Sequence, residues 1–129
     1  MLRKFILFIA ITLFSSTLNA QQSIPNITLK TVNGVKVQSN EFLNQDRFTI
    51  ISFWATWCIP CINELDAINE LYPSWKDKNI DVIAISTDDA RSKKRVRPLV
   101  SGKNWVFEIY SDTNQEFKRA LNVGGIPHT

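Results

Sequence analysis

The sequence predicts an α/β layered domain, and three observations lead to that prediction. Runs of β-branched and aromatic residues alternate with segments of helical periodicity, which favours parallel strands joined by right-handed crossovers. A hairpin precedes them, because apolar and polar residues alternate on both sides of Asn33-Gly34. The chain has 129 residues and no repeat, low-complexity tract or internal linker, so it holds one domain at most.

The first half of the domain follows from local pattern. The hairpin covers residues 27–37, and residues 38–46 form a short helical turn or loop. Residues 47–55 read "RFTIISFWA", which predicts a strand buried on both faces. A helix is expected from Pro60, because proline suits a first turn, and Pro73 is expected to end or kink it.

The second half repeats the strand and helix order. Residues 79–87 form a second buried strand, and Asp88-Asp89 can cap the helix that follows. Residues 105–112 form a third strand. Residues 113–123 form a third helix, in which Phe117, Leu121 and Ala120 are expected to face inward.

Residues 1–20 have the composition of a secretory signal peptide. Two basic residues precede an almost wholly apolar run over residues 5–14, and small and polar residues lead to Ala20. We predict export with cleavage after Ala20, which leaves residues 21–129 as the mature domain. The alternative is an uncleaved membrane anchor, because Leu18 is not the small residue that a cleavage site prefers. The apolar run is nevertheless shorter than the ~20 residues of a membrane span.

Export changes how charge and cysteines are interpreted. The signal carries two basic and no acidic residues, so its removal lowers the formal net charge from +3 to +1. The isoelectric point near 9.0 is therefore weak support for a nucleic-acid partner. In an oxidising compartment such as a bacterial periplasm disulfides form and persist, so a cysteine pair there is expected to have a role.

The chain's two cysteines, Cys58 and Cys61, form a C-x-x-C motif with several competing interpretations. Covalent haem attachment needs a histidine directly after the second cysteine, and Ile62 occupies that place. A closed zinc site needs four ligands, and the one histidine, His128, lies at the other end of the chain. A static disulfide and a redox pair remain, although a loop this short would stabilise the fold little.

The position of the motif favours the redox pair. At the start of a helix the two Cα atoms would lie roughly 5–6 Å apart, within the disulfide range. Cys58 would face unpaired backbone donors and the positive end of the helix dipole, so we expect its pKa below the free value of about 8.5. Cys61, one turn inside, would be shielded and act as the resolving thiol.

The motif also carries a family resemblance. "FWATWCIPC", followed by Glu64 and later by "GIPHT", resembles the thioredoxin superfamily, and within it the exported TlpA/ResA branch of thiol–disulfide oxidoreductases. The resemblance extends from about Pro25 to the last residue. It implies a thioredoxin-like fold with three α/β/α layers around a mixed sheet.

The resemblance implies a mechanism without a cofactor or a metal. Cys58 attacks a substrate disulfide, a mixed disulfide forms, and Cys61 resolves it. Pro127 would be a cis proline beside the cysteines, and Ile126 would offer backbone hydrogen bonds to an extended substrate; the alternative is an ordinary turn after Gly124-Gly125. The implied partners are protein thiols or disulfides and a membrane-bound thiol–disulfide electron donor.

Other residues of the motif receive roles from the same resemblance. Glu64 would move protons or tune the cysteines, or else be an ordinary residue of the first turn. Ser52 stands where many cytoplasmic thioredoxins have a buried aspartate, which makes Glu64 the better candidate acid. Trp57 and Pro60 would contact substrate and Trp54 would pack beneath the site, although both tryptophans could be core or rim aromatics.

The basic segment "RSKKRVRP", residues 91–98, has five positive charges in seven positions. Nucleic acid or anionic lipid would be one interpretation. A solvated helix face fits better, because no aromatic residue is interleaved and two aspartates precede the segment; docking to a partner is the remaining alternative. His128 could sense pH or contact substrate, but a lone histidine is more often incidental.

Members of the family continue after this proline with an antiparallel strand pair and a final helix. Nothing follows Thr129, so we expect a C-terminally incomplete domain that lacks the C-terminal β-hairpin and last helix. Such a domain would have an unpaired sheet edge and would be less stable than an extended chain.

The leading interpretation is an exported thiol–disulfide oxidoreductase that acts as a reductant, as in cytochrome c maturation or general periplasmic thiol reduction. This direction rests on the resemblance. A thiol peroxidase of the AhpC/TSA type is the enzymatic alternative, but the Pro-x-x-x-Thr/Ser-x-x-Cys context of a peroxidatic cysteine is absent. The non-enzymatic alternative is a secreted module whose cysteines form a static bridge or bind copper.

Overall fold

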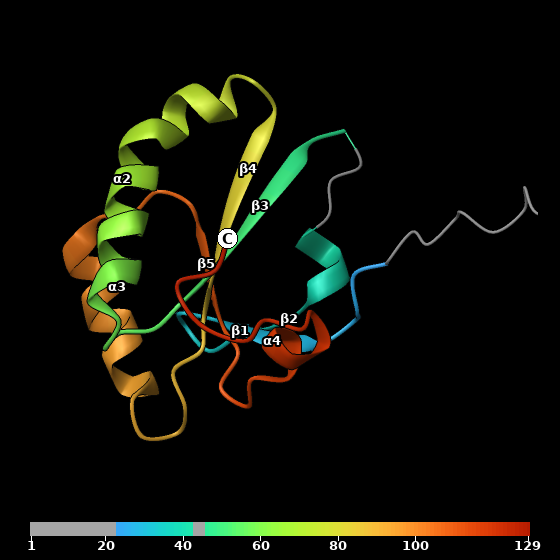
Figure 1. The fold of residues 1–129 in the computed structure, drawn as a ribbon, viewed down its shortest axis with the longest axis vertical. Coiled ribbons are helices and arrows are strands. Elements are labelled where there is room, and N and C mark those ends of the chain that lie inside the picture. The colour runs from blue at the N-terminus through green and yellow to red at the C-terminus, as the bar shows by residue number, and fades with distance from the viewer. Residues whose placement is uncertain (1–22, 43–45) are drawn as a thin grey trace, which may run out of the picture.

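The computed structural model describes residues 23–42 and 46–129 (Figure 1). The predicted signal peptide, residues 1–20, lies outside the described residues. Within the described ranges, no helix has the length and apolar character that crossing a membrane requires.

A five-stranded mixed sheet forms the centre of the domain, in the order β2-β1-β5-β4-β3. The three strands β3, β4 and β5 run parallel, and β1 is antiparallel to both of its neighbours, which confirms the predicted hairpin and crossovers. The strands are β1 (Thr28–Thr31), β2 (Lys36–Gln38), β3 (Phe48–Trp54), β4 (Ile80–Ser86) and β5 (Glu108–Ser111).

Helical elements cover both faces of this sheet (Figure 1). Their bounds are η1 (Ser39–Phe42), α2 (Ile59–Lys76), η2 (Lys93–Arg95), α3 (Val96–Lys103) and α4 (Glu116–Ala120), where η marks a 3-10 helix. The helices α2 and α3 lie on one face, and α4 and η1 lie on the other. Helices, sheet and helices thus form the three α/β/α layers predicted from the sequence.

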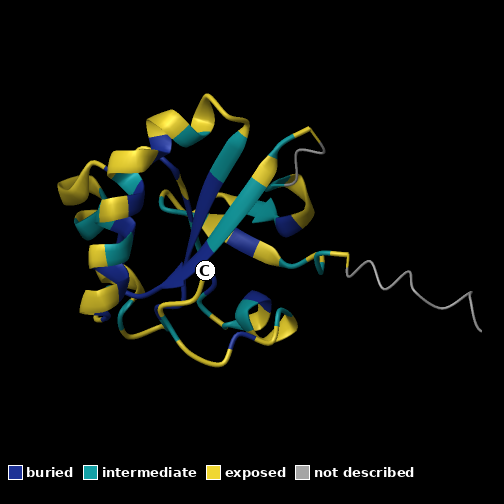
Figure 2. Ribbon diagram, turned by 45° about the horizontal axis from the view of Figure 1, so that its top comes forward, coloured by how far each residue is buried: buried dark blue, intermediate teal, exposed yellow. Residues whose placement is uncertain are grey.

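Strand β4 packs against the helices on both faces of the sheet. Val82 and Ala84 join the apolar cluster under α2 and α3, whereas Ile83 and Ile85 join the cluster under α4. Side chains alternate between the faces of a strand, so a strand apolar at every position is buried on both sides. Figure 2 shows β4 buried along most of its length, while the outer faces of the helices are exposed.

The prediction for β3 was correct in position and wrong in burial. Ser52, Phe53 and Trp54 are buried, but Phe48 is 79% exposed and the residues between them are only partly covered. The difference arises because β3 is an edge strand of the described sheet, paired along its length with β4 alone.

Two further predictions need correction. The helix α2 does not end at Pro73 but continues to Lys76, because the buried ring of Tyr72 and the partly buried Trp75 keep its last turn packed on the core. Ala120 is exposed rather than inward-facing, since α4 is only five residues long and presents Phe117 alone as its buried residue.

Candidate functional site

The cysteine pair lies at the carboxyl ends of the parallel strands. Chain segments leave the sheet there from β3 toward Cys58, from β4 toward Asp88, and from β5 toward Asp112. In open α/β sheets this edge is the usual place for binding sites, because the connecting loops converge on it.

Local geometry gives the two cysteines different environments. Cys58 is the N-cap of α2, with an extended backbone (φ −96°, ψ 93°), and its Sγ accepts the Cys61 N–H at 3.3 Å. The structure joins the two in a disulfide with Cα atoms 5.3 Å apart, within the separation expected from the spacing. Cys61 is buried one turn inside, at 1% exposure against 6% for Cys58.

A buried aspartate fixes the loop that carries Cys58. Asp88 is fully buried and accepts hydrogen bonds from the Thr56 N–H at 2.9 Å, the Thr56 hydroxyl at 2.6 Å and the Ser86 hydroxyl at 2.8 Å. The prediction that Asp88 and Asp89 cap the following helix was therefore wrong for Asp88. Asp89 accepts backbone N–H groups of the turn before η2, and does not reach the first turn of α3.

A third loop joins this assembly through Gln115. Its side-chain amide donates to the Thr87 carbonyl at 3.1 Å, which links the segment after β5 to the segment after β4. Between these loops lies a cavity of about 420 Å³. Its lining residues are Trp57, Thr87, Asp89, Arg91, Ser92 and Gln115.

The two tryptophans of the motif have opposite environments. Trp54 is fully buried and packs edge-on against Trp105, with ring centroids 5.2 Å apart, as the sequence led us to expect. Trp57 is 60% exposed and lines the cavity beside Cys58. Pro60 is also exposed, in the first turn of α2. Trp57 is thus available to an incoming molecule, whereas Trp54 is part of the core.

The C-terminal segment lies against the same region. The Ile126–Pro127 bond is cis, as expected. Ile126 packs against the apolar cluster that contains both cysteines. The backbone of His128 pairs with Phe53 on β3, with Phe53 N to His128 O at 2.7 Å, so the histidine is held by its main chain and its side chain is exposed.

Thr129 links Ser52 and Glu64 through its hydroxyl group. Its hydroxyl lies 3.0 Å from the buried Ser52 hydroxyl and donates to a carboxylate oxygen of Glu64. One hydroxyl carries one proton, so Ser52 donates to Thr129 while Thr129 donates to Glu64. Glu64 is half-buried one turn after Cys61.

The structure therefore brings most of the predicted site residues to one place. Two hydrogen-bond networks at the site escaped the sequence reasoning, namely the Asp88 network and the Thr129 bridge. Polar residues directly after β4 were a usable signal for Asp88, but no local pattern marks Thr129. Among the described residues no group of three or more His, Cys, Asp or Glu side chains is placed to bind a metal.

Comparison with known proteins gives this arrangement a family. A model described as the AhpC/TSA family matches residues 20–129. The chain belongs to the AhpC/TSA family. This family member is similar to the thiol-disulfide oxidoreductase ResA of Bacillus thuringiensis (strain Al Hakam), with 30% identity over 103 residues, or 80% of this chain. The match covers 57% of that relative, so the chain spans little more than half its length.

Solved structures agree on the fold. The solution structure of a thioredoxin-like protein from Porphyromonas gingivalis has a TM-score of 0.70 and 43% identity, covering 81% of this chain and 69% of that one. The crystal structure of StoA from Bacillus subtilis has a TM-score of 0.65 and 21% identity, covering 81% and 77%. This AhpC/TSA family member thus has the thioredoxin-like fold that the motif implied.

Proposed function

We propose that the chain is a thiol–disulfide oxidoreductase in which Cys58 exchanges with protein disulfides and Cys61 resolves the product. One observation supports this above all: the Cys58–Cys61 disulfide lies at the N-terminus of α2, between an exposed Trp57 and a buried core. The unpaired N–H groups and the positive end of the helix dipole stabilise a thiolate on Cys58. The difference in burial makes Cys58 the attacking sulfur and Cys61 the resolving one.

In the reducing direction the steps balance without a cofactor. The Cys58 thiolate attacks one sulfur of a substrate disulfide, forms a mixed disulfide and releases the other substrate sulfur as a thiolate. Cys61 then loses its proton and attacks the Cys58 sulfur, which closes the internal disulfide and releases the second substrate sulfur. The substrate gains two electrons and the enzyme loses two, so a thiol donor must reduce the pair again.

Polar residues around Cys61 supply a place for its proton. In our proposal Glu64 accepts it, and the Ser52–Thr129–Glu64 hydrogen-bond chain holds the carboxylate in position. Ile126 packs against the cluster that contains both cysteines, and we assign its main chain, next to the cis Pro127, to pairing with an extended substrate, while Trp57 and Pro60 would form the exposed rim. The similarity to ResA proteins supports these assignments, and each can be tested by substitution.

The cellular setting completes the proposal. The signal-like residues 1–20 support export to the periplasm, either free after cleavage or anchored through that segment. The resemblance to the TlpA/ResA branch supports a reductant that receives electrons from a membrane-bound thiol–disulfide donor. Fractionation of cells that express the full chain, with mass determination of its N-terminus, separates cleavage from anchoring.

The test of the chemistry is insulin reduction together with redox equilibration of the pair against glutathione. We expect activity in the wild type, loss in Cys58→Ser, and accumulation of a mixed disulfide in Cys61→Ser. A pair that does not exchange with glutathione, or a Cys58→Ser variant with full activity, would refute the proposal. Consumption of hydrogen peroxide with faster turnover than insulin would instead identify a thiol peroxidase.

A further inference from the structure

A strongly basic surface begins at the rim of the cysteine site. It consists of six exposed side chains that we call the basic surface: Arg91, Lys93, Lys94, Arg95, Arg97 and Lys30. The five cations between residues 91 and 97 exceed the formal net charge of +3 for the whole chain, so the remainder of the chain is net negative. Positive charge is therefore concentrated here.

Little inside the described part of the protein neutralises this charge. Arg91 pairs with Asp89 at 3.0 Å, and no other member of the basic surface has an ion pair among the described residues. Arg91 itself remains largely in solvent, with its side chain 91% exposed. Apart from this exposed Arg91–Asp89 pair, the surface can thus meet an anionic partner without first giving up ion pairs among the described residues.

The cations also lie where the helix does not favour them. Lys93, Lys94 and Arg95 form η2, which leads directly into α3, and the first turn of α3 has no acidic residue. The positive end of a helix dipole disfavours cations at the N-terminus and favours them at the C-terminus. A merely solvated helix would gain by the opposite arrangement, so these charges are not explained by the stability of α3.

Residues of the basic surface line two cavities, one of which also includes the residue before Cys58. The 420 Å³ cavity is lined by both Trp57, the residue before Cys58, and Arg91. Two residues further along the chain, Lys93 lines a second cavity of about 180 Å³ together with Lys30. The segment from Arg91 to Lys93 therefore contributes to both cavities, one that includes Trp57 and one that includes Lys30.

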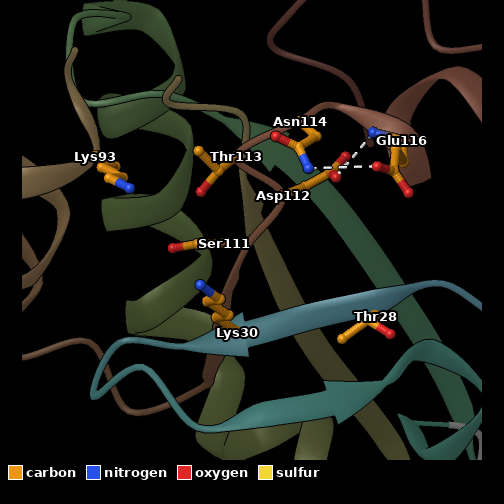
Figure 3. A pocket seen from close by; sticks show the side chains of 8 residues that line it. All are labelled: Thr28, Lys30, Lys93, Ser111, Asp112, Thr113, Asn114 and Glu116. Atoms are coloured by element: carbon orange, nitrogen blue, oxygen red, sulfur yellow. Dashed lines mark hydrogen bonds between the residues drawn. The ribbon is translucent and has the colours of Figure 1, made fainter. Parts of the chain in front are cut away.

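The second cavity has an arrangement suited to a carboxylate. Figure 3 shows the Lys30 and Lys93 side chains on either side of the Ser111 hydroxyl, with the Thr113 hydroxyl beside them. The two acids at the other end have protein partners. Asp112 accepts the backbone N–H groups of Glu116 and Lys118, and Glu116 accepts the side-chain amide of Asn114. Ammonium and hydroxyl donors are thus left at the end nearer the lysines.

We propose that the basic surface docks an acidic segment of the protein whose disulfide Cys58 attacks. The inference rests on the function proposed above. The substrate's cysteine would reach Cys58 beside Trp57, while its aspartates or glutamates lie over Arg91 and extend to Lys93 and Lys30. Complementary charge of this kind raises the rate of encounter and selects among partners more than it adds final affinity.

The test uses two synthetic peptides with one cysteine each, held as a mixed disulfide with thionitrobenzoate. The acidic peptide has aspartates beside the cysteine, and the neutral peptide has asparagines in their place. Reduced full-length protein attacks the peptide sulfur and releases coloured thionitrobenzoate. Cys61 then releases the peptide thiol and closes the protein disulfide. The ratio of the two second-order rate constants measures the preference for acid.

We expect the acidic peptide to react about tenfold faster at low ionic strength, within the range of electrostatic steering. The ratio should approach one at about 1 M salt, where the Debye length is about 3 Å. Lys93→Glu/Lys94→Glu should bring the low-salt ratio to one or below. The matched control is Lys76→Glu/Lys78→Glu, which reverses as many charges at and just beyond the last residue of α2, a helix whose 18 residues extend about 27 Å from its Cys58 end. This control variant should still react faster with the acidic peptide than with the neutral one.

The outcomes separate the two proposals. Exchange with neither peptide refutes the oxidoreductase function, whereas equal exchange with both refutes the docking surface alone. The Lys93→Glu/Lys94→Glu variant should fold, because acidic residues suit that end of α3. Binding to anionic lipid vesicles that this variant loses, with an unchanged peptide ratio, would assign the surface to a membrane and overturn the proposal.

Discussion

Replacing Asp88 with alanine tests whether one buried carboxylate holds the loop that carries Cys58. The carboxylate has no exposed surface and accepts three hydrogen bonds, two of them from Thr56, which is two residues before the cysteine. Alanine would leave the Thr56 N–H, the Thr56 hydroxyl and the Ser86 hydroxyl without their acceptor. We expect both a less stable domain and a less ordered loop.

The expected loss follows from these contacts. A hydrogen bond to a charged group contributes about 1.5–3 kcal/mol, but the variant also no longer has to bury a carboxylate. The two effects oppose each other, so we expect a decrease of about 3 kcal/mol in the free energy of unfolding for Asp88→Ala. For a domain of this size each kcal/mol lowers Tm by about 4–8 °C, which corresponds to a decrease of about 15 °C. Asp88→Asn keeps one acceptor oxygen, so its free energy of unfolding should decrease by only about 1 kcal/mol.

The assay is urea unfolding with linear extrapolation, supported by thermal melts of the oxidised protein. The neighbouring Asp89→Ala is the control, because Asp89 accepts hydrogen bonds on the surface, where water replaces them. It should lose clearly less stability than Asp88→Ala. Equal losses in the two alanine variants would refute the reasoning, since the stability would then not depend on burial of the Asp88 network.

The remaining predictions concern the core, an ion pair and the Thr129 bridge. Leu65→Ala, at a position with no exposed surface, should lower the free energy of unfolding by about 3 kcal/mol, measured by urea unfolding. Burial raises the pKa of Asp66, but hydrogen bonds from Lys103 and Trp105 outweigh it and hold the pKa below its ordinary value. In the unfolded chain the pKa of Asp66 is about 3.9, and in the folded protein it is lower. The ionised Asp66 therefore stabilises the fold above pH ~3.9, and this contribution is lost as the pH falls through the pKa of the folded state. Melts of Asp66→Asn should differ from wild type at pH 7 and converge in acid; a constant difference would contradict this. Thr129→Val should slow insulin reduction about tenfold and change its pH profile, whereas Thr129→Ser should restore both; equal rates in the two variants would contradict the bridge.

Local pattern was sufficient to place strand β4 and the start of α2, because each has one dominant cause. Strand β4 is apolar at nearly every position, which only a strand covered on both faces requires. The start of α2 was also predictable, since Pro60 suits a first turn and Cys58 precedes it. Pro73 shows the limit of such reasoning. A helix that packs Tyr72 and Trp75 on the core continues past a proline because tertiary contacts outweigh the lost hydrogen bond.

The candidate site was predictable only where its residues are close in sequence. Cys58 and Cys61 share one helical turn, and their spacing defines the motif. Asp88 acts on Thr56 across 32 positions, and Thr129 reaches Ser52 across 77. Contacts at such separations depend on strand order and register, which neither composition nor periodicity specifies.

Side-chain hydrogen bonds join the loops at the carboxyl ends of the parallel strands. They hold the loop of Cys58 in place while Trp57 beside it stays exposed to solvent. Asp88 ties the β4 loop to the cysteine loop, and Gln115 ties the β5 loop to the β4 loop, so three segments are linked by side-chain hydrogen bonds. A loop fixed in this way presents Cys58 without having to order itself when substrate arrives, which lowers the entropic cost of binding. Beside it, Trp57 is exposed and Arg91 forms a surface ion pair with Asp89, so both side chains can adjust to an incoming molecule. The exchange with protein disulfides that we propose requires such a fixed nucleophile beside an exposed rim.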